Sequence, residues 1–509
     1  MRTPHTADLP VLKTSSGEPA LCLVTGATGY IGGRLIRELL LTGYRVRVLA
    51  RGAERLRDHE WINSVEVIDG DARDSNALAA ALAGVDVAYY LLHALMSSTN
   101  FEQEENLTAE LFAAAAKSNN VKRIVYLGGL APAHQELSDH LRSRVETGRI
   151  LRDSGVPTIE LRAGVVIGSG SASFEMLRYL TERLPAMITP KWVNTRIQPI
   201  AVRDVLRYLV GSAAIDSSIS DAYDIGGPDV FTYVQMMQAY AKAAGLRKRI
   251  IVPVPVLTPN LSSGWVGLVT PVPLTLARRL VESLKNEVIC KDDRIRSLIP
   301  DPPQGLTNFH DAVELALTRI KEADVATRWT NASTPGAPSE ALPTDPDWAG
   351  GTLYSDIREV QSSATPAQLW KFVEGIGGEH GYYTATFAWE LRGFLDRIVG
   401  GAGLRRGRRD AEHLREGDAL DFWRVEALER PKLLRLRAEM KLPGLAWLEF
   451  TIEPTATGSK LIQRALFVPK GLFGHAYWWS ISPLHGFVFP GMAKHLVQAA
   501  EKAAATTTV

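Results

Sequence analysis

The stretch that most constrains this chain is Leu21–Leu35, which reads LCLVTGATGYIGGRL. An apolar run gives way to glycines and then to helix-compatible residues, which is the order of a strand, a tight turn and a helix. Gly26, Gly29 and Gly32 recur at every third position. Glycine suits such a turn because it adopts unusual φ angles and lets a pyrophosphate approach bare backbone. Since the next helix would aim free N–H groups at a phosphate, the stretch predicts dinucleotide binding.

The second predicted strand, Arg45–Ala50, ends immediately before Arg51. In a dinucleotide-binding fold the residue at this strand end meets the adenosine ribose. An acidic residue there binds the 2′-hydroxyl, whereas a basic residue accommodates a 2′-phosphate. No Asp or Glu follows before Glu54. The sequence therefore favours NADP(H), with NAD(H) as the alternative, and the other interpretation of Arg51 is a solvated loop cation.

Strand-like and helical segments alternate from residue 20 to residue 167. This alternation predicts an α/β fold with a doubly wound parallel sheet. Residues from about 169 to 325 have mostly helical patterns interrupted by prolines. They predict a mostly α-helical substrate cap over the C-terminal edge of the sheet, where ligands bind in this architecture.

The remaining sequence follows a different pattern. Residues 326–350 are rich in Ala, Pro, Thr, Ser and Gly and predict a linker. Residues 351–505 predict an α+β domain in which a curved antiparallel sheet wraps around a long terminal helix. Its expected elements are strands at 353–362, 419–427, 432–441, 446–452 and 460–467 and helices at 366–374, 389–399 and about 491–504.

Composition excludes several classes of protein. The formal net charge of +1 gives no argument for a nucleic-acid partner, and two distant cysteines support neither a disulfide framework nor a Cys-rich metal site. Residues 1–19 are polar and are expected to form a disordered leader. The most apolar later region, 250–280, is interrupted by prolines and is not expected to run as a membrane helix. We expect a cytoplasmic protein, and the sequence leaves the oligomeric state open.

A family resemblance is carried by TGATGYIG, Arg51, the Gly70–Asp71 pair and the segment Ile225–Asp229. With these features, residues 20–325 resemble the extended short-chain dehydrogenase/reductase superfamily. The likeness is to its atypical, NmrA-like branch. It implies a Rossmann domain with a substrate cap. It also implies the cofactor contacts: Thr28, Gly29, Tyr30 and Ile31 at the pyrophosphate, Arg51 at the 2′-phosphate, Asp71 beside the adenine, and Leu92, His93 and Gly128 near the ribose and nicotinamide.

Members of that superfamily usually transfer hydride with a Tyr-x-x-x-Lys pair and a serine. By the resemblance, the lysine position falls at Arg144 and the tyrosine position at His140, and the strand ending in Leu127–Gly129 lacks the serine. Arginine stays protonated, so Arg144 could bind a ribose or phosphate but not shuttle a proton. His140 and His93 are the candidate acids, since histidine titrates near neutral pH. The alternatives are a surface histidine at a helix start and a hydrogen-bonded histidine at a strand end.

The C-terminal residues resemble an uncharacterised domain appended to such reductases, with a pattern like the Bet v 1 or START helix-grip fold, whose members enclose an apolar ligand cavity. This region carries a cluster of aromatic residues: Tyr477, Trp478, Trp479, Phe487 and Phe489. They are expected to form part of a core or an interface. The alternative is that they line an apolar cavity or make a peripheral contact with a membrane surface. The basic run 405–409 is a solvated loop or a site for phosphate or an anionic lipid headgroup. The sequence thus favours an NADP(H)-dependent reductase of a hydrophobic carbonyl or alkene. The alternatives are a non-catalytic NADP(H)-binding sensor or scaffold and a carrier of hydrophobic ligands.

Overall fold

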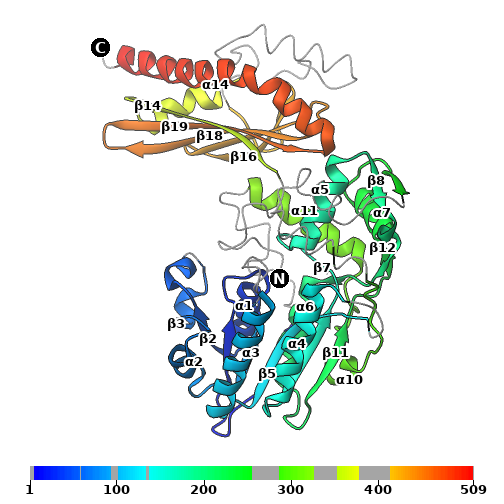
Figure 1. Cartoon of the computed structure of the whole chain (residues 1–509). Helices are drawn as coiled ribbons and strands as arrows, with labels where there is room; N and C mark the ends of the chain where they lie inside the picture. Colours follow the sequence, from blue (N-terminus) through cyan, green and yellow to red (C-terminus); the bar gives the residue numbers. More distant parts are fainter. Residues whose placement is uncertain are drawn as a thin grey trace. The chain divides into compact units, whose positions relative to one another are not determined.

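The structure, a computed structural model, describes residues 5–57, 59–92, 101–132, 137–254, 282, 286–325, 352–377 and 413–507. The chain divides into two compact units, Met1–Gly350 and Gly351–Val509. Figure 1 shows the first unit in blue to green and the second in yellow to red.

The N-terminal unit is built on a seven-stranded parallel sheet with the spatial order β11-β6-β5-β4-β1-β2-β3. This confirms the predicted doubly wound sheet. The order of strands along the chain reverses between β1 and β4, which is where nucleotides bind in such folds. The strands are β1 (Leu21–Thr25), β2 (Arg45–Ala50), β3 (Glu66–Asp69), β4 (Val87–Tyr90), β5 (Arg123–Gly129), β6 (Thr158–Ala163) and β11 (Asp221–Ile225).

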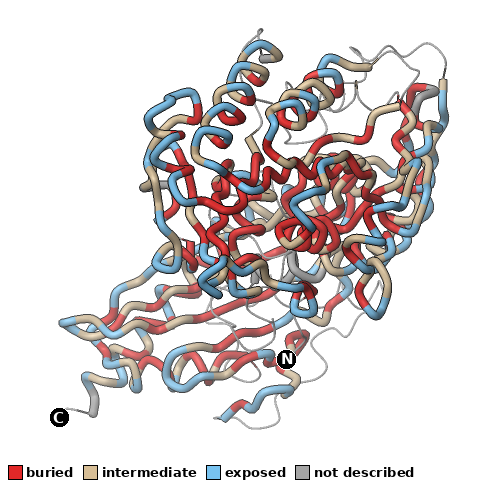
Figure 2. The backbone as a smooth tube through the Cα atoms, turned by 90° about the horizontal axis from the view of Figure 1, so that it is seen from below, coloured by how far each residue is buried: buried red, intermediate tan, exposed pale blue. Residues whose placement is uncertain are grey.

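Helices cover both faces of this sheet, so β1 is buried along its whole length. Cys22 and Val24 belong to the same core as residues of α1 and α6, while Leu21 and Leu23 point into a second core with α2 and α3. Figure 1 shows α1 beside α6 and α3 beside α4, and Figure 2 shows that buried segments, in red, gather in the interior. The helices are α1 (Tyr30–Thr42), α2 (Ser75–Leu82), α3 (Phe101–Ser118), α4 (Asp139–Asp153) and α6 (Val202–Ser212), with short 3-10 turns at Ala53–Leu56 and Ile62–Ser64.

The expected disordered leader is wrong for residues 5–19, which pack onto α1 and α6. His5 Nε2 lies 2.6 Å from an Asp204 carboxylate oxygen, and both side chains are buried. Asp8 pairs with Arg207 at 2.6 Å, and Leu9 joins the core. The polar residues of this segment pair with residues of α6 that lie far away along the chain, so its polar sequence gave no sign that it is packed.

The cap region has a core of its own and more β structure than expected. Phe174, Met236 and Val313 are among its buried residues. Three two-stranded sheets accompany the helices among the described residues of this region. Residues 274–286, part of the stretch expected to be mostly helical, fall almost entirely outside the described residues. The helices are α5 (Ala172–Arg183), α7 (Tyr233–Ala243), α10 (Ile295–Leu298) and α11 (Phe309–Val325), with a 3-10 turn at Lys191–Asn194. The strand pairs are β7 (Val166–Ile167) with β10 (Ile200–Ala201), β9 (Arg196–Ile197) with β12 (Phe231–Thr232), and β8 (Ala186–Pro190) with β13 (Ile250–Val254).

The C-terminal unit is a six-stranded antiparallel sheet, in the order β14-β19-β18-β17-β16-β15, packed against α12 and α14. Met492, Leu496 and Val497 of α14 share a core with Phe450 and Leu461 of the sheet. The strands are β14 (Tyr354–Ser362), β15 (Ala419–Leu420), β16 (Trp423–Glu429), β17 (Leu433–Ala438), β18 (Gly444–Thr455) and β19 (Gly458–Pro469). The helices are α12 (Pro366–Glu374) and α14 (Gly471–Thr507).

The terminal helix begins at Gly471, well before the expected start near residue 491. Pro483 and Pro490 lie before residue 491, and a proline inside a helix removes a helical N–H and clashes with the preceding turn. Both prolines lie inside α14, which packs against the sheet along its length. The expected helix at 389–399 lies outside the described residues. Among the described residues, no helix is both long enough and apolar enough to cross a membrane.

Candidate cofactor-binding site

The glycines after β1 make a turn that no larger residue could form. Gly26 has φ +72°, and a Cβ there would lie 2.6 Å from the Leu91 carbonyl oxygen at the end of β4. A Cβ on Gly32 would lie 2.1 Å from the Gly26 carbonyl oxygen. Gly29 is less crowded, since its Cβ would be 3.1 Å from that oxygen. The first turn of α1 therefore packs directly onto the strand end, as the glycine spacing predicts.

The N-terminus of α1 suits an anionic ligand. Its N-cap is Gly29, which has no side chain to accept from the first N–H groups, and its first turn carries no acidic residue. Thr28, Tyr30 and Ile31 flank this cap. A phosphate would supply the missing acceptors and meet the positive end of the helix dipole. The residues at this turn therefore fit the pyrophosphate of a dinucleotide.

The loop after β7 lies against the same turn. A Cβ on Gly168 would lie 2.4 Å from the Tyr30 hydroxyl oxygen, so the ring of Tyr30 lies against the loop after β7. The guanidinium of Arg34 lies 4.1 Å from the centre of that ring, and it donates to the backbone oxygen of Tyr30. Ser169 and Ser171 in this loop are buried. The Gly/Ser loop after β7 is thus packed against the start of α1.

A charged cluster lies at the ends of β2 and β3. Asp71 follows β3 and pairs with Arg73 at 2.8 Å and with Arg51 at 3.8 Å. The hydrogen bonds from Arg73 hold the pKa of Asp71 below its usual range, so this carboxylate stays ionised. Two guanidinium groups thus surround the Asp71 carboxylate, while the Asp69 carboxylate at the end of β3 accepts from the Gly52 N–H. Arg51 has 71% of its side chain exposed and could reach a bound phosphate.

The other end of the predicted site lies at the ends of β4 and β5. Leu92 follows β4, and Gly128 is the sixth residue of β5, so both are on the C-terminal edge of the sheet. His93 lies outside the described residues. A Cβ on Gly128 would lie 3.1 Å from a Glu160 carboxylate oxygen and 3.2 Å from the ring of Tyr126. A side chain larger than glycine at position 128 would therefore crowd Glu160 and Tyr126 at the strand end where the nicotinamide is predicted to bind.

Arg144 and His140 lie one turn apart on α4, on the side that meets the end of β5. Arg144 donates to the Leu127 carbonyl oxygen, and its guanidinium lies 5.0 Å from the centre of the Tyr126 ring. The Tyr126 hydroxyl donates to the backbone oxygen of Arg144 at 3.1 Å. Residues four apart share a helix face, so half-buried His140 points the same way as Arg144. The structure thus brings Arg144 next to Gly128.

Three tyrosines beside this site belong to the core. Tyr89, Tyr90 and Tyr126 are buried in β4 and β5. Burial raises the pKa of each hydroxyl above its usual range. A more weakly acidic hydroxyl is a poorer proton donor.

Sequence reasoning missed a set of buried charges behind the site. Glu160 on β6 is buried and pairs with Arg152 of α4 and, at 2.9 Å, with Arg162 of its own strand. A second carboxylate, Glu105 of α3, accepts a hydrogen bond from Ser143 of α4. One sequence signal could have revealed this group. TIELRA carries Glu160 inside a strand that helices cover on both faces, where an apolar residue is expected.

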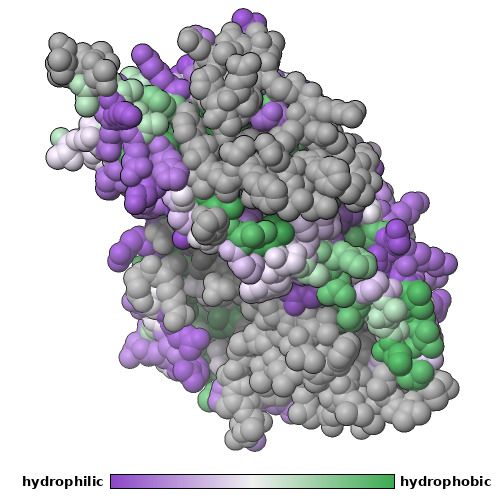
Figure 3. Space-filling view, turned by 90° about the horizontal axis from the view of Figure 1, so that it is seen from above, coloured by the Kyte–Doolittle hydropathy of each residue, from purple (hydrophilic) through white to green (hydrophobic). Residues whose placement is uncertain are grey.

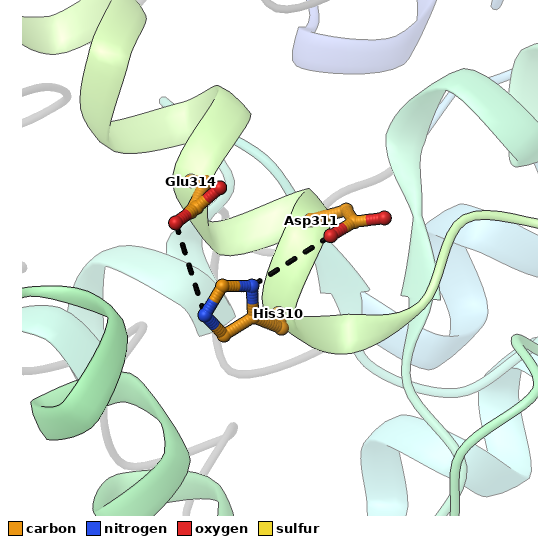
Figure 4. A group of neighbouring side chains, drawn as sticks. All are labelled: His310, Asp311 and Glu314. Atoms are coloured by element: carbon orange, nitrogen blue, oxygen red, sulfur yellow. Dashed lines mark ion pairs between the residues drawn. The ribbon is translucent and has the colours of Figure 1, made fainter.

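The described residues include one group with the geometry of metal ligands. His310, Asp311 and Glu314 lie on the first turns of α11, with ion-pair distances of 3.6 Å and 3.8 Å from His310 (Figure 4). All three are more than half exposed. Exposed acidic groups of this kind are common without an ion, so we assign no metal to them.

Two family models match parts of the chain. Residues 26–165 match a family described as NAD(P)H-binding, which covers the glycine turn and the strand ends described above. The N-terminal unit is an NAD(P)H-binding Rossmann domain. Residues 348–492 match a family described as a protein of unknown function (DUF2867).

Characterised relatives match mainly over less than half of the chain. Subunit 9 of the mitochondrial NADH dehydrogenase 1 alpha subcomplex from Arabidopsis thaliana is 25% identical over 226 residues, or 43% of this chain and 56% of that protein. The chain therefore spans little more than half the length of that relative. Ceramide reductase of Caulobacter vibrioides is 27% identical over 45% of this chain and 72% of that protein. Pinoresinol reductase 1 of Arabidopsis thaliana is 25% identical over 45% of this chain and 75% of that protein.

Solved structures resemble the same part of the chain. Citrobacter triphenylmethane reductase, solved with NADP(H), is 20% identical and has a TM-score of 0.48, covering 58% of this chain and all of that one. An NADPH-dependent quinone oxidoreductase from Escherichia coli is 20% identical with a TM-score of 0.45, covering 58% of this chain and 98% of that one.

Proposed function

We propose that this protein is an NADP(H)-dependent reductase of the atypical short-chain dehydrogenase/reductase type. Its substrate would be a hydrophobic carbonyl compound or activated alkene, held with help from the C-terminal unit. The observation that carries the proposal is the uncapped start of α1 at the Gly26–Gly32 turn, together with the exposed guanidinium groups of Arg51 and Arg73 beside Asp71. The first feature suits a pyrophosphate, and the second suits a 2′-phosphate.

The bound cofactor would supply the hydride. The residues of this chain would then position and protonate the substrate. Leu92 and Gly128 would border the nicotinamide ribose, and Arg144 would hold the end of β5 in place through the Leu127 carbonyl. His140, on the same helix face as Arg144, would give a proton to the developing alkoxide or carbanion, with His93 as the other candidate. Two relatives, a ceramide reductase and a pinoresinol reductase, support a reductase.

Cofactor binding and turnover can be tested separately on the full chain. Titration with NADPH and with NADH should give the tighter binding for NADPH. Oxidation of NADPH at 340 nm, followed with a panel of hydrophobic ketones, quinones and enones, should then reveal a substrate class. If the protein binds NADPH tightly but oxidises it with no compound of the panel, it is an NADPH-binding protein and not a reductase.

That outcome is the second candidate, a non-catalytic NADP(H) sensor or scaffold. The observation in its favour is that the usual lysine is Arg144, whose guanidinium is already engaged with Leu127 and Tyr126. In a sensor, His140→Ala should leave the biological response unchanged, whereas in a reductase it should reduce turnover.

For the C-terminal unit we propose a helix-grip fold of the Bet v 1 or START kind. Its support is the antiparallel sheet whose first and last strands, β14 and β19, are neighbours, with α14 packed against both. Part of α14 faces outward with exposed apolar side chains at Leu472, Phe473, Trp479 and Leu484, which would suit a peripheral membrane contact. Figure 3 shows apolar patches, in green, between hydrophilic residues on the face that it draws.

A further inference from the structure

In the C-terminal unit, several polar side chains lie together on the face of the sheet that packs against α14. Tyr354, Asp356, Arg358 and Val360 alternate along β14 with exposed residues and therefore share one face of the strand. Arg358 is the register partner of Gln463 on β19, and Val360 is that of Leu461. Since Leu461 lies in the core under α14, this whole face of the sheet meets the helix.

The matching face of α14 carries two histidines between aromatic rings. His475 Nδ1 lies 2.9 Å from the Tyr354 hydroxyl oxygen. His485 Nδ1 lies 3.9 Å from a carboxylate oxygen of Asp356 and packs edge-on against Trp478. The ring of Trp478 stacks on Tyr354 with 5.0 Å between ring centres, and Phe467 stacks on the same indole at 6.0 Å.

The charges of this group balance. Arg358 Nε lies 2.7 Å from an Asp356 carboxylate oxygen, so this half-buried carboxylate is neutralised by a neighbour on its own strand. A charged ligand would meet no excess of opposite charge here. The stacked rings offer apolar, flat surfaces. These features favour an uncharged ligand with a largely apolar body.

Gln463 indicates which polar group that ligand carries. Its side chain is 1% exposed, and its Oε1 has no hydrogen-bond partner among the residues that the structure describes. Its Nε2 faces the backbone oxygen of Phe489 at 3.5 Å, so exchanging the amide nitrogen and oxygen would bring two acceptors together. Leaving a buried acceptor unsatisfied costs roughly 1–3 kcal/mol. A ligand that donates a hydrogen bond to this oxygen would remove that cost.

We infer that Tyr354, Asp356, Gln463, His475 and His485 form a binding site for an uncharged, apolar molecule that carries a hydroxyl group. The hydroxyl donates to Gln463 Oε1, the aromatic rings hold the apolar body, and Asp356 orients His485 as a second polar contact. The inference rests on the ligand-holding role proposed for the C-terminal unit and is independent of hydride transfer. It implies that this unit holds an alcohol, the product class of carbonyl reduction, more tightly than the matching ketone or ether.

The test compares 2-naphthol with 2-methoxynaphthalene, which has nearly the same shape and no hydroxyl donor. Binding to the full-length protein is followed by tryptophan fluorescence and by calorimetry. We expect the alcohol to bind about tenfold more tightly than the ether, the ratio for one hydrogen bond to an otherwise unsatisfied acceptor. Gln463→Leu should abolish that ratio by weakening only the alcohol. Gln361→Leu, an exposed position on the opposite face of β14, is the matched control and should preserve the ratio.

The thermal midpoint shows whether Gln463→Leu still folds. It should stay the same or rise, because a buried unsatisfied acceptor is removed. Three outcomes would each overturn the inference. The first is that the wild type binds the two probes with equal affinities, and the second is that it shows no saturable binding. The third is that the thermal midpoint of Gln463→Leu falls by several degrees. Gly32→Ala separates the two proposals, since loss of NADPH binding there should leave 2-naphthol binding unchanged. Failure of NADPH turnover with the alcohol preference intact would count against the reductase alone.

Discussion

The contact between Gly32 and Gly26 gives the most direct test of the cofactor site. In Gly32→Ala the new Cβ would lie 2.1 Å from the Gly26 carbonyl oxygen, and that neighbour is backbone, so no side chain can rotate away. The turn and the start of α1 must separate by about 1 Å to reach an ordinary contact. Overpacking of this kind costs roughly 1–3 kcal/mol. The same shift would break one or two charge-assisted hydrogen bonds to a phosphate, each worth about 1.5–3 kcal/mol.

We therefore expect Gly32→Ala to weaken NADPH binding by at least about tenfold while the protein stays folded. Calorimetric titration measures the affinity, and thermal unfolding measures the stability. Gly84→Ala is the matched control: Gly84 has φ +70° with nothing within 4 Å of a new Cβ, and it precedes β4 at the opposite edge of the sheet. Its backbone strain costs about 1–2 kcal/mol and should leave NADPH affinity unchanged. Wild-type affinity in Gly32→Ala, or equal losses in both variants, would refute the assignment of this turn to the phosphates.

Three further predictions concern the charged groups. Arg51→Glu should weaken NADPH binding by about 10- to 100-fold and NADH binding far less, because only NADPH carries the 2′-phosphate; equal losses in titrations of the two cofactors would contradict that role. His140→Phe should lower kcat by about 100-fold with an unchanged NADPH dissociation constant, and a normal rate would exclude His140 as the acid. Burial alone would raise the pKa of Glu374, but hydrogen bonds from Arg430, the Leu414 N–H and Trp370 outweigh it and hold that pKa below its usual range. This stabilisation is present above about pH 4.3 and is lost as the pH falls through the lowered pKa, so urea unfolding of Glu374→Gln should show a flatter acid profile than the wild type; parallel profiles would refute this linkage.

The sequence predicted the parallel sheet and the position of its strand ends because both depend on local patterns. A buried strand covered on two faces reads as an apolar run, and the Gly26–Gly32 turn needs its glycines whatever the rest of the chain does. The places of Arg51 and Asp71 then follow from the order of the strands. The resemblance assigned Arg144 to the position of the usual lysine, and in the structure its guanidinium donates to the Leu127 carbonyl oxygen at the end of β5.

The features that sequence reasoning missed depend on partners far along the chain. His5 meets Asp204 across almost 200 residues, so the polar first segment gave no local sign of being packed. The terminal helix was expected to begin near residue 491, whereas α14 also contains Pro483 and Pro490, because its packing on the sheet outweighs their local penalty. The two-residue strands of the cap are too short to produce an alternating pattern.

The pairing of β14 with β19 also constrains how the C-terminal unit acquires its structure. Tyr354 lies opposite Phe467 in the register, so this edge of the sheet closes across roughly 100 residues, whereas β18 and β19 join through a short hairpin. Contacts that distant form slowly and late, so β14 should dock onto a sheet that has already assembled from β16 to β19. The same edge should open first in the native state, with its amide hydrogens exchanging before those of β18. A ligand that bridges β14 and α14 would close this edge and slow that exchange.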